Sequence, residues 1–202
     1  MSMSVESIVI ATDLNKTFKA EQKGLDDVQA LQGINMQIKT GQLTALVGPD
    51  GAGKTTFLRL IAGLYKPTAG SLEVLGMDVA KDPQSVQDRI SYMPQKFGLY
   101  EDLSIQENLD LYADLHGVPM NVRKERFARL LKITDLARFT ERPAGKLSGG
   151  MKQKLGLACT LVRSPELLLL DEPSVGVDPL SRRDLWIIIE QLVREENLSV
   201  IL

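Results

Sequence analysis

A glycine-rich segment with the spacing G-x-x-x-x-G-K-[ST] supplies the residue types that bind phosphate: Gly48-Pro49-Asp50-Gly51-Ala52-Gly53-Lys54-Thr55, followed by Thr56. Its glycines at 51 and 53 allow backbone turns that point several N–H groups into one concavity. Lys54 can reach the β- and γ-phosphates as a point charge, and the Thr55 hydroxyl can ligate Mg²⁺. An apolar strand pattern before the segment and a helix pattern after it argue against a chance match. The segment predicts a nucleotide site at residues 48–56.

A second glycine pair lies in Leu147-Ser148-Gly149-Gly150-Met151-Lys152-Gln153. Ser148 is a residue type that caps helix N-termini, and the two glycines let a ligand approach the backbone closely. The helix that follows would point its positive end at that ligand, which predicts a second anion site. An ordinary capped helix explains the segment equally well when the segment is considered alone.

With the motifs that follow, these segments resemble the ATP-binding cassette (ABC) proteins, over essentially the whole chain and through five motifs in order. The resemblance implies a P-loop NTPase fold, ATP and Mg²⁺ as cofactors, and ATP hydrolysis as the activity. In that family the phosphate loop of one subunit and the signature motif of another clamp one ATP. A head-to-tail dimer with two composite sites is therefore implied, in which Ser148, Gly149 and Gly150 contact the γ-phosphate in trans.

Two carboxylates after the run Leu167-Leu168-Leu169-Leu170 resemble the end of the family's Walker B strand. Ligands bind at the carboxyl ends of strands in such sheets, so Asp171 would hold Mg²⁺ and Glu172 would polarise the attacking water as a general base. Acids that merely cap the next turn are the alternative. Gln95, in Tyr92-Met93-Pro94-Gln95, resembles the Q-loop glutamine, which contacts Mg²⁺ or the water and relays the nucleotide state to a transmembrane partner. The implied catalytic residues are Glu172, Gln95 and Lys54, and the implied metal ligands are Thr55, Gln95 and Asp171.

Two further residues match the family individually. Asp178, in Ser174-Val175-Gly176-Val177-Asp178, resembles the D-loop residue that crosses to the other subunit, although plain N-capping explains it too. Phe18 matches the aromatic residue that stacks on adenine, although an aromatic near a strand is more often a core residue. Both are expected to contact the nucleotide or its partner subunit.

The chain departs from the family pattern at two places. Asp50 stands where the family usually has Asn, and a carboxylate near ATP phosphates repels them unless it points outward. The family's switch histidine is expected just beyond Leu202, because His116 lies before the Walker B strand and cannot be its counterpart. Without that histidine, hydrolysis by these 202 residues should be poor.

The elements that position these motifs alternate between strand and helix. Strand patterns occur at residues 34–38, 43–47, 71–75, 90–93, 167–170 and 198–202, with a polar loop at 20–28. Helix patterns occur at 54–62, from the Ser104 capping box to Tyr112, around 127–131, from 148 to about 165, and after the Asp178-Pro179 start signal. They predict an α/β fold with a central, mostly parallel sheet and an N-terminal antiparallel part. Residues 1–97 and 146–202 would form the core, and about 98–145 a helical subdomain, of one ATP-binding domain spanning 1–202.

Composition limits the kinds of binding partner that the chain is expected to have. A net charge of −2 and a pI of about 5.6 argue against nucleic acid as a partner. The single cysteine, Cys159, fits a reducing compartment and a buried thiol. No apolar run approaches the ~20 residues of a membrane helix, so work at a membrane would need docking partners. Because the chain stops inside the apolar run ending at Leu202, we expect it to be a fragment of a longer polypeptide.

The runs from Tyr92 to Leu109 and from Gly149 to Lys154 resemble the ATPase subunits of bacterial ABC-2-type exporters, the drug and multidrug group. This implies export through two transmembrane permease subunits, with the ATPase peripheral at the cytoplasmic face of the inner membrane. A place as the first of two ATPase domains would explain a start at Met1 and a truncated end. Two other functions stay open: a non-transport ABC ATPase, marked by basic surfaces or inserted arms, and a degenerate domain that clamps ATP and regulates its partner.

Overall fold

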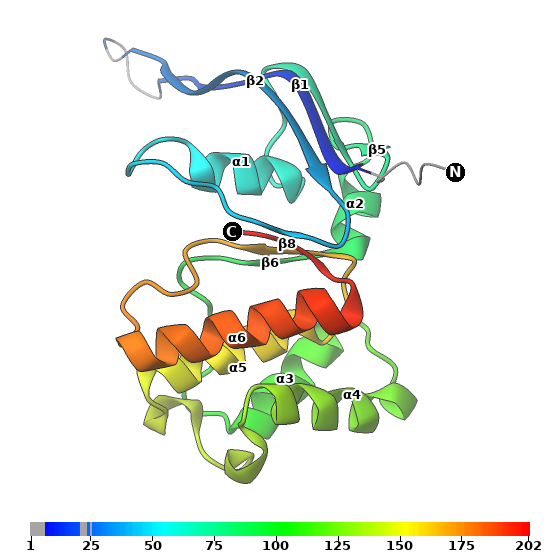
Figure 1. Cartoon of the computed structure of the whole chain (residues 1–202), viewed down its shortest axis with the longest axis vertical. Helices are drawn as coiled ribbons and strands as arrows, with labels where there is room; N and C mark the ends of the chain where they lie inside the picture. The colour runs from blue at the N-terminus through cyan, green and yellow to red at the C-terminus, as the bar shows by residue number, and fades with distance from the viewer. Residues whose placement is uncertain (1–6, 21–23, 25) are drawn as a thin grey trace.

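An antiparallel sheet forms one end of the molecule (Figure 1). The computed structural model describes residues 7–20, 24 and 26–202. The strands of this sheet, in spatial order, are β2 (Val28–Lys39), β1 (Ser7–Phe18), β4 (Ala69–Val74) and β5 (Met77–Asp78). Val9 pairs with Val74 and Ala11 with Leu72 across β1 and β4, and all of these side chains are buried. The apolar face of the sheet thus closes over the hydrophobic core next to it.

A parallel sheet forms the middle layer. Its strands lie in the order β3 (Leu43–Thr44), β8 (Ser199–Ile201), β7 (Leu167–Leu170) and β6 (Ile90–Met93). The four leucines of β7 have no exposed surface, as expected for a central strand covered on both faces. Met93 lies opposite Leu170, so β6 and β7 end side by side, and the residues that follow them share one edge of the sheet.

Helices cover both faces of the parallel sheet. In Figure 1, α1 (Lys54–Ile61) lies between the two sheets, and α5 (Gly149–Leu161) and α6 (Pro179–Glu196) cover the opposite face. Beyond them, α3 (Ile105–Leu115) and α4 (Met120–Ile133) lie at the far end of the molecule. The remaining helical elements are α2 (Pro83–Arg89) and short 3₁₀ turns at Ala137–Phe139 and Ala144–Lys146.

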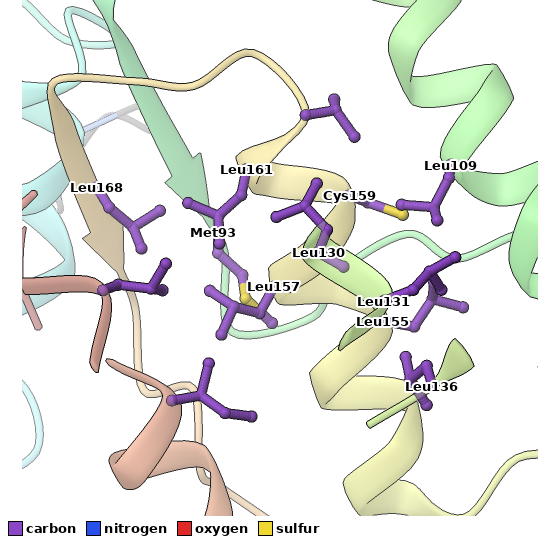
Figure 2. Packing of buried hydrophobic residues seen from close by; sticks show 14 of the residues in the cluster. Met93, Leu109, Leu130, Leu131, Leu136, Leu155, Leu157, Cys159, Leu161 and Leu168 are labelled. Carbon is purple, nitrogen blue, oxygen red and sulfur yellow. The ribbon is translucent and has the colours of Figure 1, made fainter. Parts of the chain in front are cut away.

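Within the described residues, two hydrophobic clusters meet at β7. Leu167 and Leu169 belong to the cluster that contains α1 and the antiparallel sheet. Leu168 and Leu170 belong to the cluster that contains α3, α4, α5 and α6. Figure 2 shows residues from β6, β7, α3 and α5 meeting in this second cluster, among them Met93, Leu168, Leu109, Leu157 and Leu161. Because strand side chains alternate between faces, one run of leucines completes both cores.

Helix caps follow the sequence signals. Ser104 and Glu107 form a reciprocal capping box at α3, as predicted. The Ser148 hydroxyl accepts from the backbone N–H of Met151 at 3.2 Å at the start of α5. Asp178 accepts from the backbone N–H of Ser181 at 2.9 Å at the start of α6, with Pro179 as the first helical residue. These local predictions are confirmed.

The fold class is confirmed, with differences at element ends. The strand expected over 43–47 pairs only at Leu43–Thr44, and Leu46 makes one more hydrogen bond, to the carbonyl of Leu202 at 2.6 Å. Residues 1–6 and, within the expected loop at 20–28, residues 21–23 and 25 lie outside the described residues. Across the described residues, no helix combines the length and apolar composition needed to cross a membrane.

Candidate nucleotide-binding site

The glycine-rich loop connects β3 to α1. Gly51 and Gly53 have left-handed φ angles of 78° and 88°, which favour glycine. At Gly53 the space also demands glycine, since a Cβ there would lie 2.5 Å from the carbonyl oxygen of Ala30 and 2.7 Å from Cδ2 of Leu31. The loop therefore packs closely against β2 and leads directly into α1, whose first residue is Lys54. The positive N-terminal end of this helix faces the site.

Lys54 is held inside the loop. Its ammonium Nζ donates to the carbonyl oxygens of Gly48 at 2.8 Å and Pro49 at 2.9 Å. These carbonyls are neutral acceptors, so phosphate oxygens can replace them as stronger, charge-assisted partners. The side chain is thus positioned at the loop without being committed to an ion pair.

A hydroxyl and a carboxylate meet behind the loop. The Oγ1 atom of Thr55, on α1, donates to Oδ1 of Asp171 at 2.8 Å, and Asp171 is only 3% exposed. Hydroxyl and carboxylate oxygens are the hard donors that Mg²⁺ prefers. Among the described residues, no group of three or more His, Cys, Asp and Glu side chains converges on one point. The pair therefore fits Mg²⁺, which is commonly held by one or two protein ligands together with substrate phosphates.

The second oxygen of Asp171 is also occupied. Tyr92, on β6, donates its hydroxyl to Oδ2 of Asp171 at 2.9 Å. Arg59, on α1, donates to the Tyr92 oxygen at 3.5 Å and to the Tyr65 hydroxyl at 3.1 Å. Burial raises the pKa of Tyr92, and hydrogen bonds to Tyr92 and Tyr65 raise the pKa of Arg59, so both groups keep their protons at neutral pH.

Glu172 lies beside Gln95 at the common edge of β6 and β7. The side-chain amide Nε2 of Gln95 donates to Oε2 of Glu172 at 2.7 Å. The backbone N–H of Asp171 donates to the carbonyl of Met93 at 2.9 Å, which ties the two strand ends together. Glu172 has a φ of 49°, a left-handed conformation that is uncommon for a residue with a side chain. Such strain occurs often at functional sites, where the surrounding structure holds it.

The phosphate loop from Asp50 to Thr56 and the Gln95–Glu172 pair line one cleft of about 520 Å³. Its lining brings together Phe18, Val28, Gln29, Ala30, Asp50, Gly51, Ala52, Gly53, Lys54, Thr55, Thr56, Gln95 and Glu172. Phe18 is half-buried at the end of β1, with its ring edge-to-face against Tyr65 at 5.3 Å between centroids. Asp50 is exposed and lines the same cleft as Lys54. The cleft thus combines an aromatic ring, a cationic phosphate loop and the Gln95–Glu172 pair.

The cleft does not include the remaining predicted residues, which are Ser148, Gly149, Gly150 and Asp178. These lie beside one another where α5 and α6 begin. Gly150 is packed against Ser181, whose side chain and backbone N–H lower the pKa of the Asp178 carboxyl. Ser148, Gly149 and Asp178 are exposed. The structure therefore divides the predicted residues into two groups. Most line the cleft or, like Gly48, Pro49 and Asp171, bond to Lys54 and Thr55 at its wall. The others lie on a separate surface where α5 and α6 begin.

The sequence predictions did not include Arg59, Tyr65 or Tyr92. Arg59 is four residues after Thr55, so one face of α1 presents both side chains. Tyr92, on β6, pairs with Leu169 of the neighbouring strand β7, and Asp171 follows Leu169 two residues later. The sequence shows the spacing of Arg59 from Thr55 and the place of Tyr92 on its strand. It does not show their contacts, because these depend on how α1, β6 and β7 pack against one another.

Comparison with known proteins agrees with this geometry. The sequence model of the ABC transporter family matches residues 31–175. The probable multidrug ABC transporter ATP-binding protein YbhF of Escherichia coli is 54% identical over 190 residues, which are 94% of this chain and 32% of that protein. The bacitracin transport ATP-binding protein BcrA of Bacillus licheniformis is 35% identical over 97% of this chain and 61% of that protein. The chain thus spans about a third of the length of YbhF.

Solved structures give the same fold. The cbiO1 protein of Clostridium perfringens, part of the ABC transporter complex cbiONQ, superposes with a TM-score of 0.84 at 27% identity, over 97% of this chain and 77% of that one. A dimeric, post-hydrolysis structure of the ATP-binding cassette MJ0796 with ADP and Pi has a TM-score of 0.81 at 26% identity, over 96% of this chain and 86% of that one. The family match, the fold and the cleft agree, and the chain belongs to the ABC transporter family.

Proposed function

We propose that this chain binds Mg-ATP, hydrolyses it and thereby drives substrate export through membrane partners. The observation that carries the proposal is the cleft lined by the phosphate loop and the Gln95–Glu172 pair, with Thr55 at its wall bonded to the buried Asp171 behind it. Family membership and the 54% identity to YbhF, a protein named for multidrug transport, support the same role.

Each cleft residue then has a task in binding. The base stacks on Phe18, and the phosphates lie along residues 48–56, where Lys54 exchanges the Gly48 and Pro49 carbonyls for the β- and γ-phosphate oxygens. Thr55, Asp171 and Gln95 are the groups that would hold Mg²⁺. When bound, Mg²⁺ supplies positive charge that stabilises the phosphates during transfer.

Glu172 acts as the general base. A water oxygen attacks the γ-phosphorus, its proton passes to Oε2 of Glu172, and the bond from the γ-phosphorus to the bridging oxygen breaks to release ADP. Gln95 donates to that same Oε2 atom, at 2.7 Å. When the water arrives, it takes the place of the Gln95 amide on Glu172, and Gln95 turns to the metal or the water. This exchange links the Gln95 segment to the state of the nucleotide.

We infer that the exposed residues Ser148, Gly149 and Asp178, together with the buried Gly150 between them, would act on a second ATPase domain. They lie outside the chain's own cleft, so a contact with nucleotide needs another domain, in a head-to-tail dimer with two composite sites. The dimeric ATP-binding cassette MJ0796 supports such an arrangement. Two transmembrane permease subunits would complete the transporter, and the ATPase would be peripheral at the cytoplasmic face of the inner membrane. Residues 1–97 and 146–202 would form the core of the domain, and about 98–145 its helical subdomain.

Hydrolysis by the parent protein and its Glu172→Gln variant tests the proposal. The assay uses a longer natural polypeptide that contains these residues and extends past Leu202, because hydrolysis by the 202 residues alone should be poor. We expect turnover in the parent, none in the variant, and nucleotide binding in both. Equal turnover in both proteins would contradict the role of Glu172, and absence of binding would contradict the site.

A degenerate regulatory domain is the second candidate, and the exposed Asp50 beside Lys54 in the cleft favours it. A carboxylate there opposes the phosphates and weakens binding. ATP binding without turnover in the parent, together with tighter binding in Asp50→Asn, would support this role over catalysis.

A further inference from the structure

We propose that Tyr92, backed by Arg59, is a positioning residue that fixes the Asp171 carboxylate for Mg²⁺. The inference rests on the proposed Mg-ATP site and adds two residues to it. Its starting point is a closed ring of contacts: Thr55 to Asp171, Asp171 to Tyr92, and Tyr92 to Arg59, with Thr55 and Arg59 both on α1.

Burial makes the orientation of Asp171 depend on these contacts. The residue is 3% exposed, so water cannot easily replace a lost donor. Thr55 occupies Oδ1 at 2.8 Å and Tyr92 occupies Oδ2 at 2.9 Å. Each oxygen thus has its own donor, and the carboxylate plane is fixed from both sides. Removal of one donor frees the group to rotate about its terminal torsion, which has broad preferences.

Arg59 sets the direction of the Tyr92 proton. A guanidinium only donates, so the Tyr92 oxygen must accept from Arg59 Nε at 3.5 Å. The remaining hydroxyl proton is then free to point at Asp171, its 2.9 Å partner. Arg59 also donates to Tyr65 at 3.1 Å, which anchors the guanidinium at a second point. The ring therefore holds Asp171 ready to ligate through Oδ1, beside the Thr55 hydroxyl.

Tyr92→Phe is the direct test, because it removes only the hydroxyl. Tyr65→Phe is the matched control, since it removes the other hydroxyl bound to Arg59 and leaves Asp171 untouched. The readout is the affinity for the fluorescent nucleotide mant-ATP in excess Mg²⁺ and in EDTA, measured on the 202-residue protein. The ratio of the two dissociation constants gives the contribution of Mg²⁺ to nucleotide affinity, and it can be measured without ATP hydrolysis. Thermal denaturation without ligand checks that the variants fold.

We expect Tyr92→Phe to reduce the Mg²⁺-dependent gain in affinity about tenfold, the effect typical of a lost partner behind a metal ligand. Affinity in EDTA and the control Tyr65→Phe should stay close to the parent. Arg59→Gln should reduce the gain less than Tyr92→Phe and add nothing in the double variant, because it acts through Tyr92. An unchanged gain in Tyr92→Phe would overturn the inference, as would an equal loss in EDTA or in Tyr65→Phe. If the parent itself binds mant-ATP equally with and without Mg²⁺, the proposed metal site fails and the inference with it.

Discussion

Gly150→Ala tests how closely the starts of α5 and α6 pack together. A Cβ at Gly150 would lie under 3.0 Å from both Oγ and Cβ of Ser181, a separation that real Cβ atoms essentially never show. Gly149, its neighbour in the same helical turn, has open space around the place that a Cβ would take, with nothing within 4 Å apart from its chain neighbours and its own helix backbone. The two glycines therefore differ in what an added methyl group meets, and each is the control for the other.

The expected loss in stability follows from this difference. An extra methyl in a packed region costs about 1–3 kcal/mol, and the better helix propensity of alanine returns at most about 1 kcal/mol. Because the added Cβ meets two atoms of Ser181, the cost lies in the upper part of that range, about 2–3 kcal/mol, and a net loss of roughly 1–2 kcal/mol remains for Gly150→Ala. For a domain of this size, about 1 kcal/mol shifts Tm by about 2–4 °C. Thermal denaturation followed by circular dichroism, without nucleotide, should show Tm lower by about 2–8 °C. Gly149→Ala should leave Tm unchanged or slightly higher.

Second substitutions at Ser181 test whether its side-chain atoms cause the loss of stability in Gly150→Ala. Ser181→Ala removes Oγ but keeps Cβ, so it should rescue Gly150→Ala only in part. Ser181→Gly removes both atoms and should restore Tm to that of the Ser181→Gly single variant. Equal Tm values for Gly149→Ala and Gly150→Ala, or no rescue by Ser181→Gly, would refute the packing argument.

Three further predictions concern the cap, the thiol and the loop. The backbone N–H of Ser104 lowers the pKa of Glu107, so this carboxylate stabilises the fold above its unfolded pKa of about 4.3 and loses that effect as pH falls through its folded value. Glu107→Gln should therefore lower Tm at pH 7 and have little effect near pH 3, as seen in a pH series of melting curves. Burial raises the pKa of the Cys159 thiol, so Ellman's reagent should label it only after denaturant is added; rapid labelling of the native protein would contradict the burial. Asp50→Asn should tighten mant-ATP binding by roughly twofold to fivefold, an effect that shrinks with added salt, and unchanged affinity would mean that the carboxylate points away from the phosphates.

Features that depend on local sequence could be predicted well. The four leucines before Asp171 form β7 at the predicted residues, because a continuous apolar run suits a strand covered on both faces. Ser104, Ser148 and Asp178 cap the predicted helices, since a cap needs only its own first turn. The phosphate loop likewise follows β3 and leads into α1, within one short stretch of chain.

Features that depend on tertiary packing could not be predicted in the same way. The Tyr92–Asp171 contact joins residues 79 apart in sequence, and no local pattern marks it. The left-handed φ of Glu172 could not be predicted from the sequence either, because that conformation is normally indicated by glycine or asparagine. Val47, expected inside a strand, is 94% exposed and lies beyond β3, which pairs with β8 only at Leu43 and Thr44.

The alternating leucines of β7 also bear on how the protein unfolds. Leu167 and Leu169 complete one hydrophobic cluster, and Leu168 and Leu170 complete the other. Neither cluster can lose β7 without exposing apolar surface in its neighbour, so the two halves of the molecule should melt in a single cooperative transition. Amide hydrogens at β7 should then exchange only through global unfolding, and they would report the full stability of the molecule. A core lesion remote from the cleft, such as Leu130→Ala in α4, would accordingly accelerate exchange at Asp171 as well.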